Sequence, residues 1–111
     1  MSFSEDEVRE LTDMFPGAEE ASEGGVRYFL LPSLGMPEGR EPSRVDALLC
    51  PTARDGYPSR LFLAQQIHGG RGSNWNASVR ILERNWYALS WRVNPNLRLV
   101  QMVAAHLEAF R

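Results

Sequence analysis

Three short apolar segments constrain the fold of this chain more than any other feature. They are residues 26–32 (VRYFLLP), 44–50 (RVDALLC) and 60–67 (RLFLAQQI). Aliphatic, aromatic and β-branched residues dominate them, and the loops between them are rich in Gly and Pro, which is typical of strands joined by turns. Because no helical pattern separates them, the three segments predict an antiparallel meander.

Helices are predicted on both sides of this meander. Near the N-terminus, Ser4 and Glu7 have the spacing of a capping box, and Pro16-Gly17 ends the apolar stripe that follows. Residues 18–25 (AEEASEGG) are then expected to form a polar loop. Asn94-Pro95 has the pattern of an N-cap followed by proline in the first turn, which predicts a last helix from there to the end of the chain.

Between the meander and this last helix, apolar residues recur at alternating spacings of four and three. They are Trp75, Val79, Leu82, Trp86 and Leu89. This periodicity places one apolar stripe along a helix, so residues 75–89 are predicted to be helical. The predicted fold is therefore α+β, with an N-terminal helix, an antiparallel meander of three to four strands, and two C-terminal helices packed on one face of the sheet.

The length and composition fit a single domain over residues 1–111. The chain has 43% hydrophobic and 23% charged residues, as ordinary globular proteins do, and no apolar stretch approaches the roughly 20 residues that span a bilayer. The acidic start MSFSEDEVRE lacks the pattern of a secretion signal, and one cysteine excludes an internal disulfide. We therefore expect a cytoplasmic protein that does not bind a membrane.

No cofactor, metal or nucleic acid is predicted as a ligand. The cysteine and the two histidines lack the spacing of a metal site, and HGGRG lacks the residues that hold nucleotide phosphates. The arginines of residues 71–98 are too sparse for a nucleic-acid-binding patch. All 12 basic residues are arginine. One explanation for the absence of lysine is codon bias in a GC-rich genome. The functional alternative is that the protein handles activated acyl groups and therefore has no lysine amine of its own that could be acylated.

Cys50 is the only cysteine, and two interpretations of it are open. A nucleophile requires a thiolate stabilised by a base, a cation or a helix N-terminus, and Arg54 or His68 could come near enough to supply this. A lone cysteine at the end of an apolar strand is more often a small core residue.

The other candidates are two histidines and three tryptophans. His68 precedes Gly69-Gly70, where it either takes part in catalysis or closes a turn by hydrogen bonding to the backbone. His106 lies beside the apolar stripe of the last predicted helix and is interpreted as a boundary residue. The tryptophans either fill the space between helices and sheet or form an interface; they are Trp75, Trp86 and Trp91.

The order of these features resembles the ubiquitin-conjugating enzyme (UBC) fold superfamily. Pro51 and Tyr57-Pro58 are similar to the turn that follows a strand in that family, and Ile67-His68-Gly69-Gly70 is similar to the start of its histidine-containing flap. The segment NWYALSWRVNPNLRLV also resembles the Trp-rich C-terminal segment of a bacterial branch, found beside ubiquitin-like proteins, activating enzymes and metal-dependent deubiquitinase-like peptidases. The resemblance covers most of the chain and implies a UBC-like fold.

The chain departs from the family pattern at the catalytic cysteine. Only His68 remains of the His-Pro-Asn motif, and residues 71–79, where the family has its thioester cysteine, contain none. Cys50 precedes the Tyr-Pro turn, so the resemblance implies a protein that forms no thioester in the usual way. It implies instead a non-catalytic protein that binds a ubiquitin-like protein or its activating enzyme in a bacterial modification or defence system. Tyr57, Pro58 and the three tryptophans are its candidate binding residues.

Two alternatives stay open at this point. The chain could be a divergent transfer enzyme that uses Cys50 or His68, or a plain α+β interaction domain unrelated to ubiquitin-like pathways. The hypothesis of a plain interaction domain predicts an exposed apolar patch, for which Leu34 and Met36 are candidates. The sequence leaves the oligomeric state open.

Overall fold

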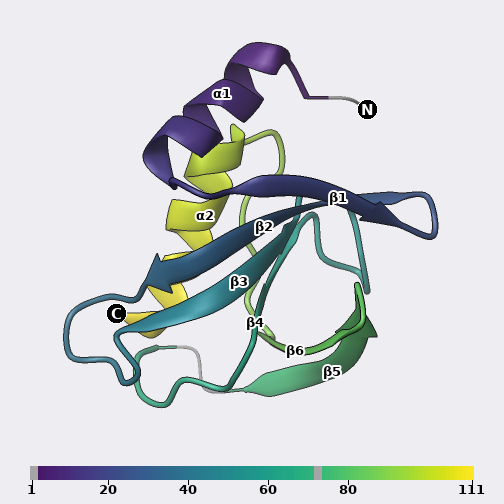
Figure 1. Cartoon of the computed structure of the whole chain (residues 1–111). Coiled ribbons are helices and arrows are strands. Elements are labelled where there is room, and N and C mark those ends of the chain that lie inside the picture. The colour runs from purple at the N-terminus through teal and green to yellow at the C-terminus, as the bar shows by residue number, and fades with distance from the viewer. Residues whose placement is uncertain (1–2, 72–73) are drawn as a thin grey trace.

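A computed structural model describes residues 3–71 and 74–111 (Figure 1). Its elements, in chain order, are α1 (Glu5–Met14), β1 (Glu19–Glu23), β2 (Val26–Gly35), β3 (Arg44–Cys50), β4 (Arg60–Leu63), β5 (Trp75–Ile81), β6 (Arg84–Leu89), α2 (Leu99–Leu107) and a short 3-10 helix, η1 (Glu108–Phe110). All six strands form one antiparallel sheet with the order β1-β2-β3-β4-β6-β5. Neither α-helix is long and apolar enough to cross a membrane.

The start of α1 follows the predicted capping pattern. The Ser4 hydroxyl accepts a hydrogen bond from the Glu7 backbone N–H at 3.1 Å, which satisfies one of the free donors of the first turn. Leu11 is the residue of α1 that is fully buried. The helix ends before Pro16-Gly17, where Gly17 has a φ of 89°.

The meander is present and has one more strand than its three apolar segments predicted. β2, β3 and β4 pair in sequence, with Leu49 opposite both Phe29 and Leu61. The additional strand, β1, covers residues that the sequence predicted to be a polar loop. It pairs with β2 across a turn at Gly24-Gly25, where both φ values are positive, as a tight hairpin requires.

The helix predicted over residues 75–89 is wrong, because these residues form a hairpin of β5 and β6. The spacing of the large apolar residues fits a helix, but polar and apolar residues also alternate one by one along this segment, as they do in a strand. Asn76, Ser78 and Arg80 are exposed, and the residues between them are half-buried. The turn consists of Leu82 and Glu83, whose φ values are 52° and 64°. Such a turn usually contains Gly or Asn, so the sequence does not mark it.

The predicted fold class is corrected accordingly. The chain is α+β, but it has a six-stranded sheet and two α-helices instead of a meander of three to four strands with two C-terminal helices. The UBC-like arrangement predicted from the sequence is therefore not the one observed. The last helix is also shorter than predicted. It begins after Arg98, whose backbone N–H donates to the Gln101 side chain, and Asn94-Pro95 lies in the preceding loop.

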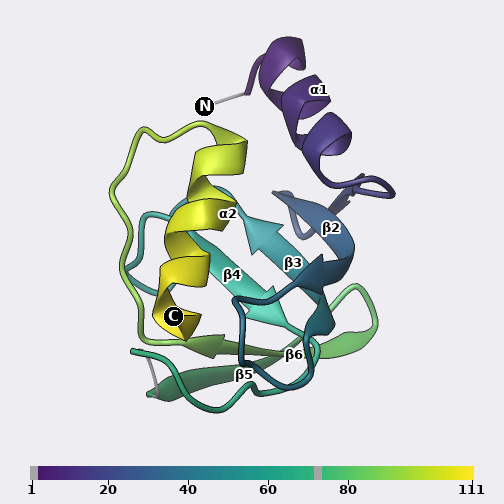
Figure 2. The same cartoon turned by 90° about the vertical axis from the view of Figure 1, so that its left-hand side faces the viewer.

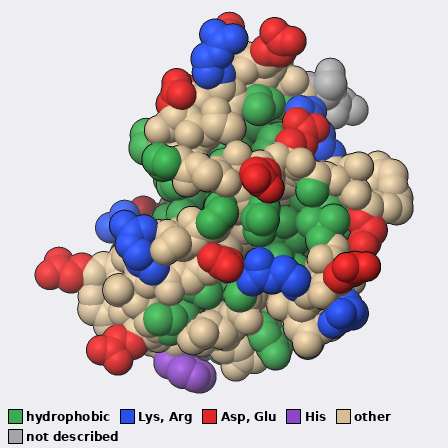
Figure 3. Space-filling view, viewed as in Figure 1, with side chains coloured by type: hydrophobic (Ala, Val, Ile, Leu, Met, Phe, Trp, Pro, Cys, Tyr) green, Lys and Arg blue, Asp and Glu red, His purple; other side chains and the backbone are tan. Residues whose placement is uncertain are grey.

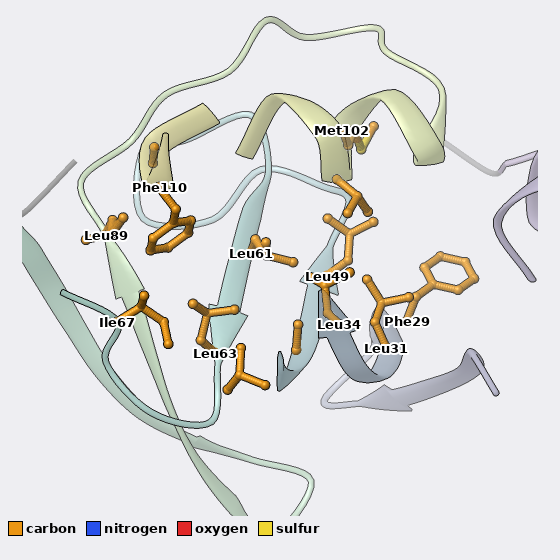
Figure 4. Packing of buried hydrophobic residues seen from close by; sticks show 14 of the residues in the cluster. Phe29, Leu31, Leu34, Leu49, Leu61, Leu63, Ile67, Leu89, Met102 and Phe110 are labelled. Carbon is orange, nitrogen blue, oxygen red and sulfur yellow. The ribbon is translucent and has the colours of Figure 1, made fainter. Parts of the chain in front are cut away.

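One face of the sheet carries the main hydrophobic core. α2 lies across this face and α1 packs beside α2 (Figure 2). Apolar side chains from β2, β3 and β4 point toward α2, as Figure 4 shows for Leu31, Leu49 and Leu61 beneath Met102. This core buries most of the aliphatic side chains of the chain, so it is the main source of stability.

The opposite face of the sheet has a second, smaller core. Its members are Tyr28, Leu48, Cys50, Phe62, Ile81, Trp86 and Ala88. The tips of the two outer hairpins meet on this side, since the Leu82 backbone N–H donates to the Glu23 carboxylate at 3.2 Å. Charged side chains surround apolar ones on the side of the molecule seen in Figure 3, and Arg84 lies over the Trp86 ring at 4.7 Å from its centroid.

Candidate binding site at the Tyr-Pro turn

The segment between β3 and β4 is a well-defined turn. Arg54 and Tyr57 exchange two backbone hydrogen bonds of 2.9 Å around Asp55-Gly56. The φ values of Asp55 and Gly56 are 55° and 86°, as expected of an Asp-Gly hairpin turn. This closed turn holds Tyr57 and Pro58 in one orientation at the start of β4.

Arg60 anchors the turn from inside the protein. Its guanidinium is 3% exposed and lies 4.3 Å from the centroid of the Tyr57 ring. It donates hydrogen bonds to the Asp55 carboxylate at 3.2 Å, to the Asn76 side-chain oxygen and to the Leu89 carbonyl at 2.7 Å. One buried cation therefore joins the turn to β5 and β6.

Tyr57 is held at its hydroxyl as well as at its ring. The hydroxyl shares a hydrogen bond with Ser90 at 2.8 Å and accepts one from the Asn76 amide at 3.0 Å. The hydrogen bond with Ser90, followed by that with Asn76, lowers the pKa of the Tyr57 hydroxyl. Arg92 lies over the same ring, 5.0 Å from its centroid. Tyr57 is thus a partly exposed aromatic side chain with a fixed position, which suits a contact in a protein interface.

His106 connects α2 to the same region. Its Nε2 shares a hydrogen bond of 3.0 Å with the Ser59 hydroxyl, and both side chains are buried. Burial, and secondarily the positive charge of Arg60, lowers the pKa of His106 from 6.5 to about 4. The sequence interpretation of His106 as a boundary residue is therefore wrong, because the imidazole is a neutral, buried link between α2 and β4.

We predict that the stability of the fold falls as the pH is lowered from about 6.5 to about 4. In this window the unfolded chain binds a proton at His106 and the folded chain does not, so acid favours unfolding by up to roughly 3 kcal/mol. His106→Gln should flatten this part of the pH profile in urea-unfolding measurements. His68→Gln is the matched control, since it removes the exposed histidine and should leave the profile as in wild type. An unchanged profile in His106→Gln would contradict the assignment.

A groove of about 620 Å³ lies beside the Tyr-Pro turn. Its walls come from the N-terminal end of α1, from the segment between β3 and β4, and from the long loop before α2, which runs up one side of the molecule in Figure 2. The lining is mainly apolar. It includes Phe3, Pro51, Ala53, Pro58, Pro95, Leu97 and Met102, with Glu7 as its carboxylate. Ser59, the partner of His106, lies at the same groove.

Cys50 and His68 differ in their exposure to solvent. Cys50 is 0% exposed, in the second core, and its thiol lies 3.5 Å from the Thr52 carbonyl oxygen. His68 is exposed in the loop after β4, and its backbone carbonyl accepts a hydrogen bond from Arg40 at 3.3 Å. Arg54 does come near the second core, but its guanidinium lies over Phe62 and donates to the Tyr28 hydroxyl at 2.9 Å.

The three tryptophans have different surroundings. Trp75 is half-buried against Phe110, with ring centroids 6.1 Å apart. Trp91 packs on the main core, and its indole N–H donates to the Ala105 carbonyl at 3.1 Å. Trp86 is fully buried on the opposite face of the sheet, where its N–H donates to Ile81. Trp75 and Trp91 thus lie between sheet and helix, whereas Trp86 does not.

Within residues 3–71 and 74–111, no group of three or more His, Cys, Asp or Glu side chains is arranged to hold a metal ion. Comparisons with protein families, with curated proteins and with solved structures found no match to this chain. The site is therefore interpreted from its own geometry. Sequence reasoning singled out Tyr57 and Pro58 but missed Ser59, Arg60, Asn76 and Ser90. Asp55-Gly56 was an available signal for the turn that precedes Tyr57, but no local signal marked Asn76 or Ser90.

Proposed function

We propose that this chain is a non-catalytic binding domain of a ubiquitin-like modification system, and that its partner is the ubiquitin-like protein. The observation that carries the proposal is the complete burial of Cys50, the only cysteine of the chain. Thioester transfer needs a thiolate that a partner's carboxyl group can reach. A thiol with no exposed surface, packed in the second core at the end of β3, does not meet this requirement.

The resemblance of Pro51 and Tyr57-Pro58 to the turn of the UBC superfamily supports the choice of pathway. These residues lie beside or in the groove. The absence of lysine from the chain is compatible with this role, because no side-chain amine is available to accept an activated ubiquitin-like protein.

The groove has the chemistry of a protein-binding surface. Its apolar lining provides area to bury, and Pro58 in this lining follows Tyr57, whose ring is fixed by Arg60 and whose hydroxyl makes two hydrogen bonds. Glu7, in the acidic first turn of α1, lines the groove, so one wall carries a negative charge. A partner that fits has an apolar contact surface with basic residues at its rim.

The proposal is tested by titrating the chain with a purified ubiquitin-like protein, using isothermal titration calorimetry. Ala53 is exposed and lines the groove, so Ala53→Arg introduces bulk and a positive charge where the partner is expected. This change should weaken binding at least about tenfold. Ala104→Arg, an identical change at an exposed position of α2 outside the groove, should leave the affinity unchanged.

Three results would overturn the proposal. One is the absence of binding by the ubiquitin-like protein. Another is binding by its activating enzyme alone, which would assign a different partner. The third is an equal loss of affinity in Ala53→Arg and Ala104→Arg, which would place the interface elsewhere.

A further inference from the structure

The two edges of the sheet differ in how they are protected against pairing with another strand. β1 forms one edge and β5 the other. Three of the five residues of β1 are glutamates (Glu19, Glu20 and Glu23), and repeated charges at an edge disfavour association. β5 has seven residues, of which only Arg80 is charged. Figure 1 shows β5 at the lower border of the sheet with no helix or strand beyond it.

The backbone of β5 presents free hydrogen-bonding groups at this edge. Ile81 and Arg84 close the two-residue turn of the β5–β6 hairpin, and such closing pairs bond to each other. The ladder is regular from Ala77 to Ile81, so Ser78 and Arg80 direct their N–H and C=O groups outward. In the described part of the chain, no backbone hydrogen bond from another loop reaches these groups.

The side chains of β5 are self-complementary about Ser78. On either side of it stand Ala77 and Val79, which are apolar, and then Asn76 and Arg80, which are polar. In an antiparallel pair centred on Ser78, Ala77 lies opposite Val79 of the second copy, and Asn76 lies opposite Arg80. No like charges meet, because the one arginine faces an amide. β1 has no equivalent register, since two copies of it bring six glutamates together.

We propose that β5 pairs antiparallel with β5 of a second copy of this chain, with Ser78 on the two-fold axis. The two Ser78 residues exchange backbone hydrogen bonds, and the two sheets become one continuous sheet. The paired segment is short, so we expect a weak dimer that forms at high protein concentration. The groove is lined by no residue of β5, so the dimer and the proposed partner would occupy different surfaces.

Disulfide cross-linking tests the register. Residues in a hydrogen-bonded antiparallel pair have Cα atoms about 5.5 Å apart, which a disulfide can bridge. Ser78→Cys should cross-link under mild oxidation at least about tenfold faster than Ser22→Cys, because Ser22 is an exposed serine on the other edge strand. Cys50 is buried and does not compete. Equal rates for the two variants would overturn the proposal.

Sedimentation velocity over a concentration series provides an independent readout. Ser78→Lys places two positive charges at the axis and should weaken self-association at least about tenfold, whereas Ser22→Lys should not. Circular dichroism and the thermal midpoint establish that both variants are folded. A dimer that survives Ser78→Lys, or a wild-type chain that stays monomeric throughout the series, would show that β5 is not the interface between copies.

Discussion

Replacing Gly70 by alanine is expected to destabilise the fold by about 3 kcal/mol or more, a large part of the 5–15 kcal/mol typical of a domain. Gly70 has a φ of 86°, which disfavours any residue with a Cβ. A Cβ at this position would also lie 2.6 Å from the Phe110 Cα and 2.7 Å from the Ala109 carbonyl oxygen. These are backbone atoms, so the contact cannot be relieved by a change of rotamer.

Gly56 provides a matched control for this substitution. Its φ is also 86°, but no atom lies within 4 Å of a Cβ built there. Gly56→Ala should therefore cost only about 1–2 kcal/mol, the conformational part of the effect. Urea unfolding at neutral pH measures both values. Similar costs for the two variants would contradict the close approach of the loop after β4 to the C-terminal segment.

The substitution Arg60→Met is expected to destabilise the fold by about 3 kcal/mol. It removes the three hydrogen bonds to Asp55, Asn76 and the buried Leu89 carbonyl, which then has no donor from this side chain. Most of the cost comes from the buried Leu89 carbonyl and from the lost contact with the Tyr57 ring, because Asp55 and Asn76 are exposed and can bond to water instead. The Tyr-Pro turn should also lose its order, since the Tyr57 ring packs on this guanidinium.

Arg84→Met is the matched control for the buried arginine. Arg84 also pairs with an aspartate, Asp46, at 3.1 Å and also lies over an aromatic ring, that of Trp86. It differs in being 43% exposed, and an exposed pair of this kind contributes at most about 1 kcal/mol. The two arginines make similar contacts but differ in burial. The difference between the free energies of unfolding of the two variants therefore measures the effect of burying the arginine. A loss in Arg84→Met as large as in Arg60→Met would contradict this account.

The sequence predicted those elements whose signals are local. Ser4 and Glu7 marked the start of α1, and apolar segments bounded by proline and glycine marked β2, β3 and β4. β1 was missed because its five residues are mostly acidic and exposed, so they have no apolar face. It is a strand because Gly24-Gly25 turns it back onto β2.

The β5–β6 hairpin could not be predicted because two periodicities coexist in it. Trp75, Val79 and Trp86 fit a helical stripe, but the exposed Ser78 and Arg80 alternate with apolar residues as in a strand. The unmarked turn at Leu82-Glu83 left nothing to decide between them. Tertiary contacts decide instead, since Trp86 fills the second core and its N–H finds the Ile81 carbonyl.

The candidate site was only partly visible in the sequence. Tyr57 and Pro58 belong to one local motif, so they could be singled out. Asn76, Ser90 and His106 come from three other parts of the chain, and the proximity of Asn76 and Ser90 to Tyr57 depends on β5 and β6 being strands. With a helix predicted there, no reasoning from spacing could bring Asn76 to the Tyr57 hydroxyl.

Whether this protein lacks a thiol for transfer chemistry can be measured as the rate at which a thiol reagent labels Cys50 at neutral pH, in the native protein and in denaturant. Ala53→Cys supplies an exposed thiol in the same protein as an internal standard. The burial of Cys50 predicts native labelling at least about a thousandfold slower than in denaturant, with fast labelling at position 53. A native rate for Cys50 close to the denatured rate would contradict the account, because the thiol would be accessible for transfer chemistry.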